Sequence, residues 1–488
     1  MEPLYQSTRD ACQKATSKQA ILNGICQDGG LYVWPDLDTV HLDLQTICKQ
    51  SYQENAIYIL SQLLPDFTME ELQDCVYNAY TKRFAHENVT PLKKVGNTYV
   101  LELFHGPTSA FKDVALTLLP QLMQKALYQT NQKALILTAT SGDTGKAALS
   151  GFQDVDQIGI EVFYPHHKVS AIQYRQMACQ QGKNVKVYAI EGNFDDAQSQ
   201  VKQLFLDEDL RRLCAEKNIL LTSANSINIG RLVPQIVYYF EAYKQLVRQG
   251  VIQIGDPIAY SVPTGNFGDV LAGYYGYLMG LPVSKFYVAS NANKVLTDFL
   301  TTGVYDRNRD FIQTISPSMD ILISSNLERL LYYMSGKDCK RVKEWMDQLQ
   351  KEGRYDVGKD MLDQLQSLFA CGYVEDEQTK ATILEVYEKE KYVLDPHSAI
   401  AYEVAKQESG VVVALATASP YKFSQDVLSA LGMQEEDEWK AMEVLSSVCQ
   451  DPIPSALQQL QSLPILHADV ITKDTMKEAV LQGCEVFL

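Results

Sequence analysis

The sequence has few of the residues and patterns that build metal sites, disulfide scaffolds or membrane spans. It holds seven histidines with no H-E-x-x-H pattern, and its ten cysteines stand singly, without a C-x-x-C pair. Zinc sites, redox motifs and disulfide frameworks need such spacings, so we expect no metal site and reduced thiols, as in the cytoplasm. No uninterrupted apolar run approaches the length of a membrane span, and the N-terminus has no basic segment followed by an apolar one. We therefore expect neither a membrane partner nor a signal peptide.

Positive charge is also scarce. The 43 Lys and Arg residues against 60 Asp and Glu residues give a net charge of −17, which argues against a nucleic-acid partner. A small anion can still bind, because a local nest of amides or one Arg outweighs distant, screened charges. With 46% apolar and 21% charged residues over 488 positions, the composition predicts a folded globular protein of two or three domains.

Short apolar runs alternate with segments of helical period from about residue 93 onward. Continuous apolar strands separated by helices predict an α/β fold with parallel sheets covered on both faces. The predicted strands are 99–104, 134–138, 160–164, 185–190, 219–223, 258–262, 286–289 and 411–416. The predicted helices between them are 114–128, 147–152, 171–181, 197–206, 232–248 and 270–279.

Two helical stretches lie outside this alternation. Residues 1–92 form a helix-rich N-terminal segment with amphipathic runs at 44–64 and 69–84. A charged helical stretch spans residues 294–407 approximately, and we predict that it is an insertion packed against the main sheet. Its predicted helices are 327–334, 342–350, 361–369 and 379–391.

Lys112 stands where the turn that begins at His105-Gly-Pro runs into an apolar helical segment. An ammonium group there loses hydration, so it either pairs with a neighbour or its pKa falls and it becomes a usable amine. A snorkelling or ion-paired lysine is the alternative interpretation.

Four loops at the carboxyl ends of predicted strands could bind a ligand. In Thr138–Gly145, small hydroxyl residues and glycines allow amides to converge on a carboxylate, although a capped turn is the alternative. A P-loop is excluded there, because positions 140 and 147 are Thr and Ala. In Ser261–Asp269, two glycines three apart can expose amides to a phosphate; the spacing is not G-x-G-x-x-G, and a tight turn without ligand is the alternative.

The remaining two loops carry amides, hydroxyls and one arginine. Ser223–Arg231 can recognise a phosphoryl or carboxylate group, with N-capping and a surface Arg as the alternative. Thr417 follows the strand 411–416 and by itself is a turn residue. One lysine, two anion sites and a strand-end hydroxyl together fit a Schiff base with pyridoxal phosphate, in which the glycine loop holds the phosphate and the hydroxyl contacts the ring nitrogen.

Motifs spread over nearly the whole chain resemble those of threonine synthases of the longer bacterial and fungal type, which are fold type II pyridoxal-phosphate enzymes. These motifs are Tyr5–Arg9, Asp28–Val33, Phe104–Asp113, Ala139–Gly145, Glu191–Gln198, Asn225–Arg231, Gly265–Asp269 and Leu394–Ala399.

The resemblance implies a tryptophan synthase β-like fold with two parallel-sheet α/β domains. We expect a large cofactor domain formed by 93–130 and 236–425, a small substrate domain at 131–235, and an extension at 426–488 packed on the large domain. Either a monomer or a homodimer is compatible with the sequence.

The resemblance also implies an activity, the conversion of O-phospho-L-homoserine and water to L-threonine and phosphate by γ-elimination and β-addition of water. Lys112 is then the Schiff-base residue and the general base. The other cofactor-binding residues implied are Asp143, Gly265, Asn266, Phe267, Gly268, Asp269 and Thr417. For the substrate we expect contacts from Ser141, Gly142, Thr144, Ser226, Asn228 and Arg231, the last three as our inference for its phosphate.

This chain departs from the family pattern after Thr417. Ser419 stands where the family usually has a histidine, and Tyr421 replaces a small residue. Another fold type II enzyme, such as a serine/threonine dehydratase or a cysteine synthase, is one alternative function. A catalytically silent threonine-synthase-like binding protein is the other.

Overall fold

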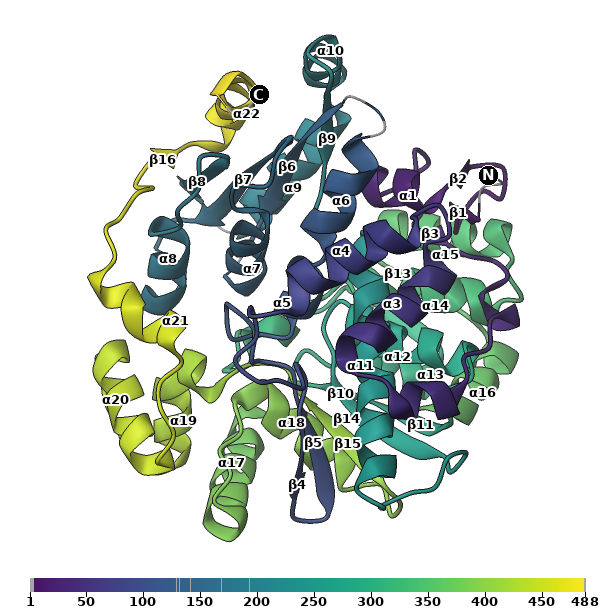
Figure 1. Ribbon diagram of the computed structural model, residues 1–488, viewed down its shortest axis with the longest axis vertical. Helices are drawn as coiled ribbons and strands as arrows, with labels where there is room; N and C mark the ends of the chain where they lie inside the picture. Colours follow the sequence, from purple (N-terminus) through teal and green to yellow (C-terminus); the bar gives the residue numbers. More distant parts are fainter. Residues whose placement is uncertain are drawn as a thin grey trace.

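The computed structural model describes residues 4–128, 130, 132–140, 142–167, 169–192 and 194–486, and two parallel sheets dominate it (Figure 1). In the larger sheet, β4 is antiparallel to its neighbour and the other strands are parallel. The strand order is β14 (Phe369–Tyr373), β11 (Val283–Ser290), β10 (Ile258–Pro263), β15 (Val412–Ala416), β5 (Thr98–Glu102) and β4 (Leu92–Val95). The smaller sheet is parallel, in the order β16 (Val470–Ile471), β8 (Val185–Ile190), β7 (Ile158–Pro165), β6 (Lys133–Ala139) and β9 (Ile219–Thr222).

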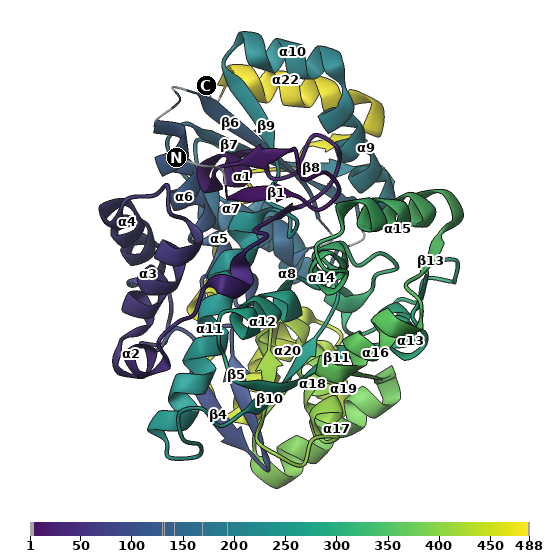
Figure 2. The same cartoon turned by 90° about the vertical axis from the view of Figure 1, so that its right-hand side faces the viewer.

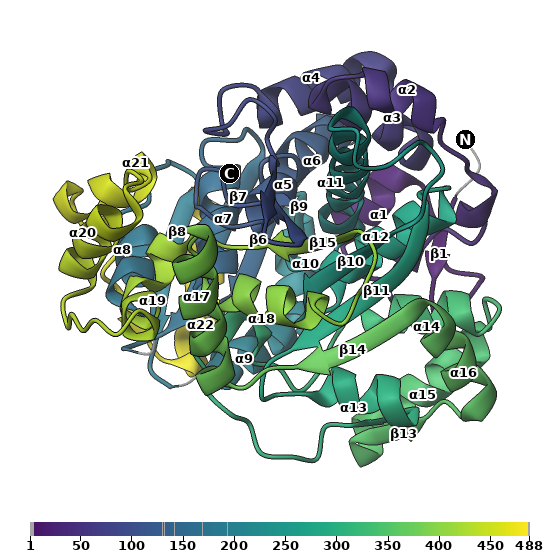
Figure 3. The same ribbon diagram turned by 90° about the horizontal axis from the view of Figure 1, so that it is seen from below.

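Both faces of the large sheet are buried at its central strands, which explains why most residues of β10 and β15 are apolar. Ala259 belongs to a core cluster with Ile400, whereas its neighbour Tyr260 belongs to another cluster with Tyr239. Successive residues of a strand point to opposite faces, so helices cover the sheet on both sides. Seen from below, α18 (Pro396–Ala405) lies against β10, β11 and β15 (Figure 3). The prediction of an α/β fold with parallel sheets covered on both faces is confirmed.

Apart from α10 (Glu208–Glu216), which was not predicted, the connecting helices agree with the predicted segments in place and differ in their limits. They are α5 (Lys112–Leu116), α6 (Leu119–Tyr128), α7 (Asp143–Phe152), α8 (Ala171–Ala178), α9 (Phe194–Leu206), α10 (Glu208–Glu216), α11 (Ile229–Arg248) and α12 (Gly268–Leu278). The single helix predicted over 114–128 is two helices, α5 and α6. Among all the residues that the structure describes, no helix is long and apolar enough to cross a membrane.

The N-terminal segment combines a small antiparallel sheet with helices. The sheet has β2 (Lys14–Ala15), β1 (Tyr5–Ser7) and β3 (Tyr32–Val33), and the helices are α1 (Ser17–Asn23), α2 (Leu44–Lys49), α3 (Tyr52–Leu63) and α4 (Met69–Tyr80). The run 44–64 is broken because Ser51 caps α3 in a capping box with Glu54. An apolar period continued across this break, so the sequence pattern alone did not reveal it.

The stretch 294–407 was predicted to be helical, and this is only partly correct. Its helices are α13 (Val295–Thr302), α14 (Leu327–Met334), α15 (Cys339–Glu352), α16 (Lys359–Leu368), α17 (Asp376–Glu390) and α18. It also contributes β14 to the edge of the large sheet and a hairpin of β12 (Val304–Asp306) and β13 (Arg354–Asp356). Residues of the insertion are therefore part of the main sheet as well as packed against it.

The C-terminal extension reaches both sheets, whereas we expected all of it on the large domain. Helices α19 (Ser424–Ala430) and α20 (Glu438–Cys449) pack together, and α19 also contacts α17. The chain then crosses to the small sheet, where β16 pairs with β8 and α22 (Met476–Val486) lies beside α10 (Figure 2). Short apolar side chains of α22, including Val480, complete a core cluster of the small sheet.

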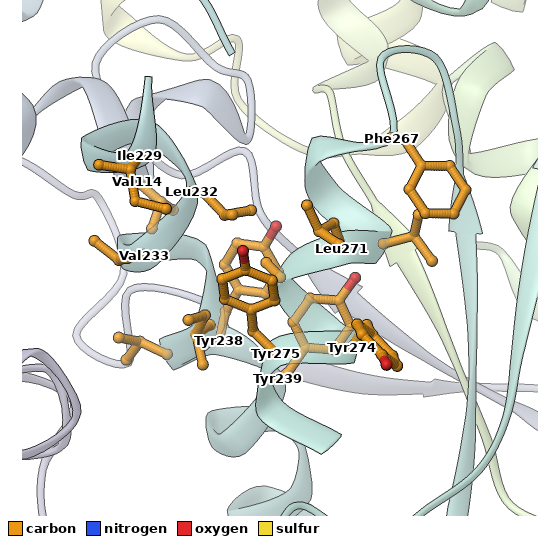
Figure 4. Packing of buried hydrophobic residues seen from close by; sticks show 14 of the residues in the cluster. Val114, Ile229, Leu232, Val233, Tyr238, Tyr239, Phe267, Leu271, Tyr274 and Tyr275 are labelled. Carbon is orange, nitrogen blue, oxygen red and sulfur yellow. The ribbon is translucent and has the colours of Figure 1, made fainter. Parts of the chain in front are cut away.

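Helix α11 is buried along most of its length, and it packs against α12, α5 and the N-terminal helices α2 and α3. It packs against α12 through a group of aromatic rings. Tyr238 and Tyr239 of α11 face α12, and Tyr274 and Tyr275 of α12 belong to the same group (Figure 4). This rigid pair of helices carries two of the candidate ligand loops at its N-terminal ends.

Candidate active site

Lys112 is the first residue of α5, in the loop that follows β5. This loop is tied to the segment after β15, because the Phe111 amide donates to the Thr417 carbonyl at 2.8 Å and the Ser419 amide donates to the Ser109 carbonyl at 3.0 Å. The carboxyl ends of two adjacent parallel strands thus bring Lys112 and Thr417 to one edge of the large sheet. Thr417 is buried, and its hydroxyl has no hydrogen-bond partner among the described residues.

The charged groups around Lys112 come from four elements. Burial lowers the pKa of Lys112 to about 8, and the positive charges of Lys422 and Arg231 act in the same direction. The carboxylates of Asp143 and Asp113 oppose this shift. Lys112 forms no ion pair within the described chain, so its amine is available near neutral pH.

Asp143, at the start of α7, is paired with a lysine that we did not predict. Its carboxylate lies 2.6 Å from the ammonium of Lys422, and the two side chains are 4% and 1% exposed. Burial by itself would raise the pKa of Asp143, but Lys422 and Lys112 hold it well below its usual range. The pair joins η3 (Pro420–Phe423), which follows the large sheet, to a helix of the small sheet.

The loop between β10 and α12 has the geometry of an anion cradle. Phe267 has a φ of 62°, and the turn leads directly into the N-terminus of α12, where helix amides have no intrahelical partner. A Cβ on Gly265 would lie 2.6 Å from the carbonyl oxygen of Ser318, so only glycine fits there. Asn266 completes the turn, and its carbonyl accepts a bond of 3.0 Å from the amide of Asn326.

A clamp that we did not predict holds this loop from the insertion. The Asn326 side chain donates to the Asn266 carbonyl at 3.1 Å, and the Ser324 hydroxyl donates to the Gly265 carbonyl at 2.7 Å. Arg329, fully buried, donates to the Asn326 side chain and to the Ile227 carbonyl. The clamp links the loop before α12 to the loop before α11, and no spacing in the sequence signals it.

Asp269 lies in α12 with its carboxylate in the core. Oδ1 accepts hydrogen bonds from Tyr238 at 2.6 Å and Tyr239 at 2.9 Å, and burial raises the pKa of Asp269 to about 6. The carboxylate faces α11 and not the anion cradle. Our prediction that Asp269 binds the cofactor therefore finds no support for its side chain.

In the loop before α11, some side chains are used in internal hydrogen bonds and others are available to contact a ligand. Asn228 caps α11, since its Oδ1 accepts from the Gly230 amide and its Nδ2 donates to the carbonyls of Ile21 and Ser223. Its amide is fully used, so the capping alternative describes Asn228 and the substrate role predicted for it is not supported. Ser226 lies beside the start of α12, with its Cβ 3.9 Å from the position that a Cβ on Gly268 would occupy.

Arg231 is buried without a carboxylate partner in the described chain. One amino group of its guanidinium donates to the Ala224 carbonyl at 2.8 Å, and Nε has no hydrogen-bond partner. Burial lowers the pKa of Arg231 to about 10, which leaves it charged at neutral pH. A buried cation with an unused donor is suited to bind an anion.

The loop between β6 and α7 is organised by Thr140, a residue that is not among the predicted site residues. Its hydroxyl accepts from the amides of Gly142 at 3.0 Å and Gly145 at 2.9 Å. Gly142 has a φ of 149°, and a Cβ there would meet the side chain of Gln173 at 2.4 Å. Thr144 is half-buried in the first turn of α7, and Ser141 lies outside the described residues.

The site as a whole is a set of strand-end loops around a half-buried lysine, with one anion cradle at a helix N-terminus and one buried, unpaired arginine. Together with two parallel α/β sheets, this arrangement defines a class, the enzymes that bind pyridoxal phosphate through a lysine of an α/β fold.

Comparison with known proteins identifies the family within this class. The family model "Pyridoxal-phosphate dependent enzyme" matches residues 84–417, "Threonine synthase N terminus" matches 4–80 and "Threonine synthase, C-terminal" matches 398–480. The chain belongs to the threonine synthase family of pyridoxal-phosphate-dependent enzymes, which confirms the resemblance and the fold type II expectation.

Relatives match the chain over most of its length. It is 40% identical over 439 residues to the threonine synthase of Pseudomonas aeruginosa, covering 87% of this chain and 90% of that one. It is 36% identical to "Threonine synthase-like 1" of Homo sapiens, covering 96% of this chain and spanning only 64% of the length of that relative. A crystal structure of pyridoxal-phosphate-bound threonine synthase from Brucella melitensis superposes with a TM-score of 0.88 at 36% identity, covering 99% and 100% of the two chains.

Proposed function

We propose that this protein is a threonine synthase, a lyase that converts O-phospho-L-homoserine and water to L-threonine and phosphate. The observation that carries the proposal is that one site contains both a lysine whose pKa is lowered and a buried arginine that lacks a carboxylate partner. The lysine provides the amine that pyridoxal phosphate requires, and the arginine provides charge for a phosphorylated substrate.

The residues present fit pyridoxal phosphate. The turn from Gly265 to Gly268 offers helix-start amides to its phosphate, and the free hydroxyl of Thr417 is suited to its ring nitrogen. Lys112 is the covalent attachment point. When bound, the cofactor supplies an electron sink for the carbanions of the reaction. A neutral hydroxyl cannot stabilise a protonated ring nitrogen as an aspartate would, so Thr417 favours the unprotonated form.

The substrate then lies between the small-sheet loop and α11. Amides around Gly142 and the hydroxyl of Thr144 hold its carboxylate, while Arg231 and Ser226 hold its phosphate. The Lys112 amine accepts the α proton, because a pKa of about 8 leaves part of it unprotonated near neutrality, and it accepts a β proton after it has passed the first one on. The γ-phosphate leaves, and the β carbon takes up the hydroxyl group of water. Of the two abstracted protons and the proton from water, one goes to the γ carbon, one to the α carbon and one to the released phosphate.

A second candidate function follows from Ser419. Its hydroxyl caps the short helix η3 by accepting from the Tyr421 amide, and residue 419 supplies no imidazole to the site. If the reaction needs that imidazole, the protein is a binding protein that holds pyridoxal phosphate without turnover. A serine/threonine dehydratase is the other alternative, and it would release ammonia and a keto acid.

A phosphate-release assay with O-phosphohomoserine separates these functions, with serine and threonine as parallel substrates. We expect phosphate and threonine from the first substrate and no keto acid from the other two. Lys112→Ala should abolish turnover and the visible absorbance of the bound cofactor. A cofactor absorbance band without any phosphate release would instead identify a silent binding protein.

Arg231 offers a sharper test of the substrate. Arg231→Gln removes the buried charge and should lower kcat/KM for O-phosphohomoserine about 30-fold, or about 2 kcal/mol, mainly through KM. Arg248→Gln, at the exposed end of the same helix, is the matched control and should leave KM unchanged. Equal kinetics of the two variants would assign Arg231 a structural role only.

A further inference from the structure

Lys422 is a buried lysine with a fixed position in the site. Its side chain is 1% exposed, and its ammonium lies 2.6 Å from Asp143 Oδ1 and 3.2 Å from the Thr108 carbonyl oxygen. It reaches from η3, at the end of the large sheet, to α7 of the small sheet. Thr108 belongs to the loop that carries Lys112, so Lys422 contacts both the lysine loop and the carboxylate.

Two cations therefore compete for the carboxylates of this site. The charged groups that face Lys112 are Asp143 from α7, Lys422 from η3, Arg231 from α11 and Asp113 from its own helix. Asp113 is occupied locally, because the Thr108 amide and hydroxyl donate to its two oxygens at 2.8 and 2.6 Å. Asp143 is thus the carboxylate that could capture Lys112, and Lys422 holds it.

We propose that Lys422 is a positioning residue that occupies Asp143 and thereby keeps Lys112 an unpaired amine. Its value for catalysis rests on the proposed function, in which Lys112 must react as a free amine. Which of the two lysines pairs with Asp143 depends on the chain alone, so the pairing can be tested without substrate.

The electrostatics of the site support this division of roles. An amine beside an unpaired buried carboxylate is held as ammonium, whereas an amine beside another cation loses its proton more easily. Lys422 does both things for Lys112, since it neutralises Asp143 and adds a positive charge nearby. The pKa of about 8 for Lys112, well under its ordinary 10.5, agrees with this.

The test is a titration of Lys112 in the cofactor-free full-length protein. Trace acetic anhydride labels unprotonated amines, and mass spectrometry of the Lys112 peptide across pH gives the pKa of this residue. Lys422→Met should raise the pKa of Lys112 by about one unit or more, and therefore slow its labelling at pH 7 about tenfold. Lys422→Arg, which keeps the charge, should titrate close to the parent.

The double variant Lys422→Met with Asp143→Asn separates capture by Asp143 from a general effect of the substitution. Without the carboxylate, Lys112 should return to within about half a unit of the parent pKa. An unchanged or lowered pKa in Lys422→Met would overturn the proposal, and so would a double variant shifted as far as Lys422→Met alone. Lys422→Leu, which also lacks a donor to Asp143, replaces the methionine variant if that protein does not fold.

Lys244→Met is the matched control, because Lys244 is also a buried lysine paired with a carboxylate, Glu241. It lies on α11 about 20 Å from Arg231 at 1.5 Å per residue, so the pKa of Lys112 should not move. Pyridoxal phosphate added before labelling should protect Lys112. Failure of that protection would contradict the proposed function and leave the titration of the variants fully informative.

Discussion

The burial that makes Lys112 a usable amine also makes it unfavourable for folding. Its pKa is about 8 in the folded chain against an ordinary 10.5, so the unfolded chain binds more protons between these values. The resulting penalty is full below pH 8, shrinks between pH 8 and 10.5, and vanishes above. Its size is about 3 kcal/mol at most, and less where water reaches the half-buried side chain.

Lys112→Met should therefore stabilise the cofactor-free protein at pH 7 by about 1 to 3 kcal/mol while abolishing activity. The gain should decline as the pH is raised from 8 to 10.5, because the parent then loses its unfavourable charge. Denaturant unfolding at several pH values measures both effects. Lys125→Met is the control, since the bond to Asp74 raises the pKa of Lys125 and its removal should give no stabilisation. A pH-independent gain in Lys112→Met would point to apolar packing alone.

At this same scale, the sequence identifies the residues whose chemistry is local and misses those whose partners are distant. Lys112 and Gly265 stand out because a lysine before an apolar helix and a glycine pair before another are unusual by themselves. Lys422 looks like any polar residue until the fold brings it to Asp143, which lies in the other half of the chain. Asn228 has suitable chemistry for a ligand, and only its three observed bonds show that its side chain is used internally.

At the scale of elements, the turn before α12 depends on a close approach between two backbones. Gly265 faces the Ser318 carbonyl, and Ser318 is itself held because its amide donates to His397 Nε2 at 3.1 Å. His397 is fixed in turn by Asp395 at 2.6 Å from Nδ1. Three elements therefore support the cradle: the turn itself, the segment that contains η2 (Pro317–Met319) and the start of α18.

Gly265→Ala should disrupt this cradle, because its Cβ would lie 2.6 Å from a backbone oxygen that cannot rotate away. We expect pyridoxal phosphate to bind at least tenfold more weakly, as measured by absorbance titration of the cofactor-free protein. Gly276→Ala in α12, the helix that follows this turn, is the control, since the nearest contacts of its Cβ would be ordinary ones at 3.4 Å. It should keep the parental affinity and add slightly to stability. Parental affinity in Gly265→Ala would show that the turn shifts without consequence.

The elements themselves follow largely from the sequence, with failures that have physical causes. The eight predicted strands are all present, because burial on both faces makes them continuous apolar runs. Strand β14 was not predicted: its first residue ends the predicted helix 361–369, and its other four residues lie between two predicted helices. Its five residues FACGY have no alternation and gain their partner, β11, from tertiary structure. Strand β16 has two residues, too few for any pattern.

At the scale of the whole molecule, the chain ends connect parts that are distant in sequence. Near the N-terminus, Arg9 forms two bonds of 2.8 Å with Glu328, next to Arg329 of the clamp around the cradle. At the other end, residues 450–486 form a C-terminal strap that leaves α20 and crosses to the small sheet (Figure 1). Arg175 of α8 binds this strap through the carbonyls of Leu460, Gln461 and Leu463.

The strap also ends the small sheet, which explains why the C-terminal extension could not be assigned from sequence. The amides of Ala189 and Glu191 in and after β8 donate to the carbonyls of Asp469 and Ile471 at 2.9 and 3.0 Å. Without β16, the outer side of β8 would be an open edge with unpaired amides. We infer that the strap stabilises the small sheet as its edge strand and its covering helix.

Removal of residues 465–488 tests this role by hydrogen exchange of individual amides. The amides of Ala189 and Glu191 lose their acceptors, so their protection should fall by at least about 1 kcal/mol. On the other side of β8, the amides of Ile160 and His166 donate to the carbonyls of Asn184 and Ile190, and they serve as the internal control. They should retain more of their protection, because the truncation removes neither these amides nor the carbonyls that accept from them. Equal loss on both sides would mean that the strap is needed for the small sheet to fold at all, and no loss on the outer side would show that β16 contributes nothing to the sheet.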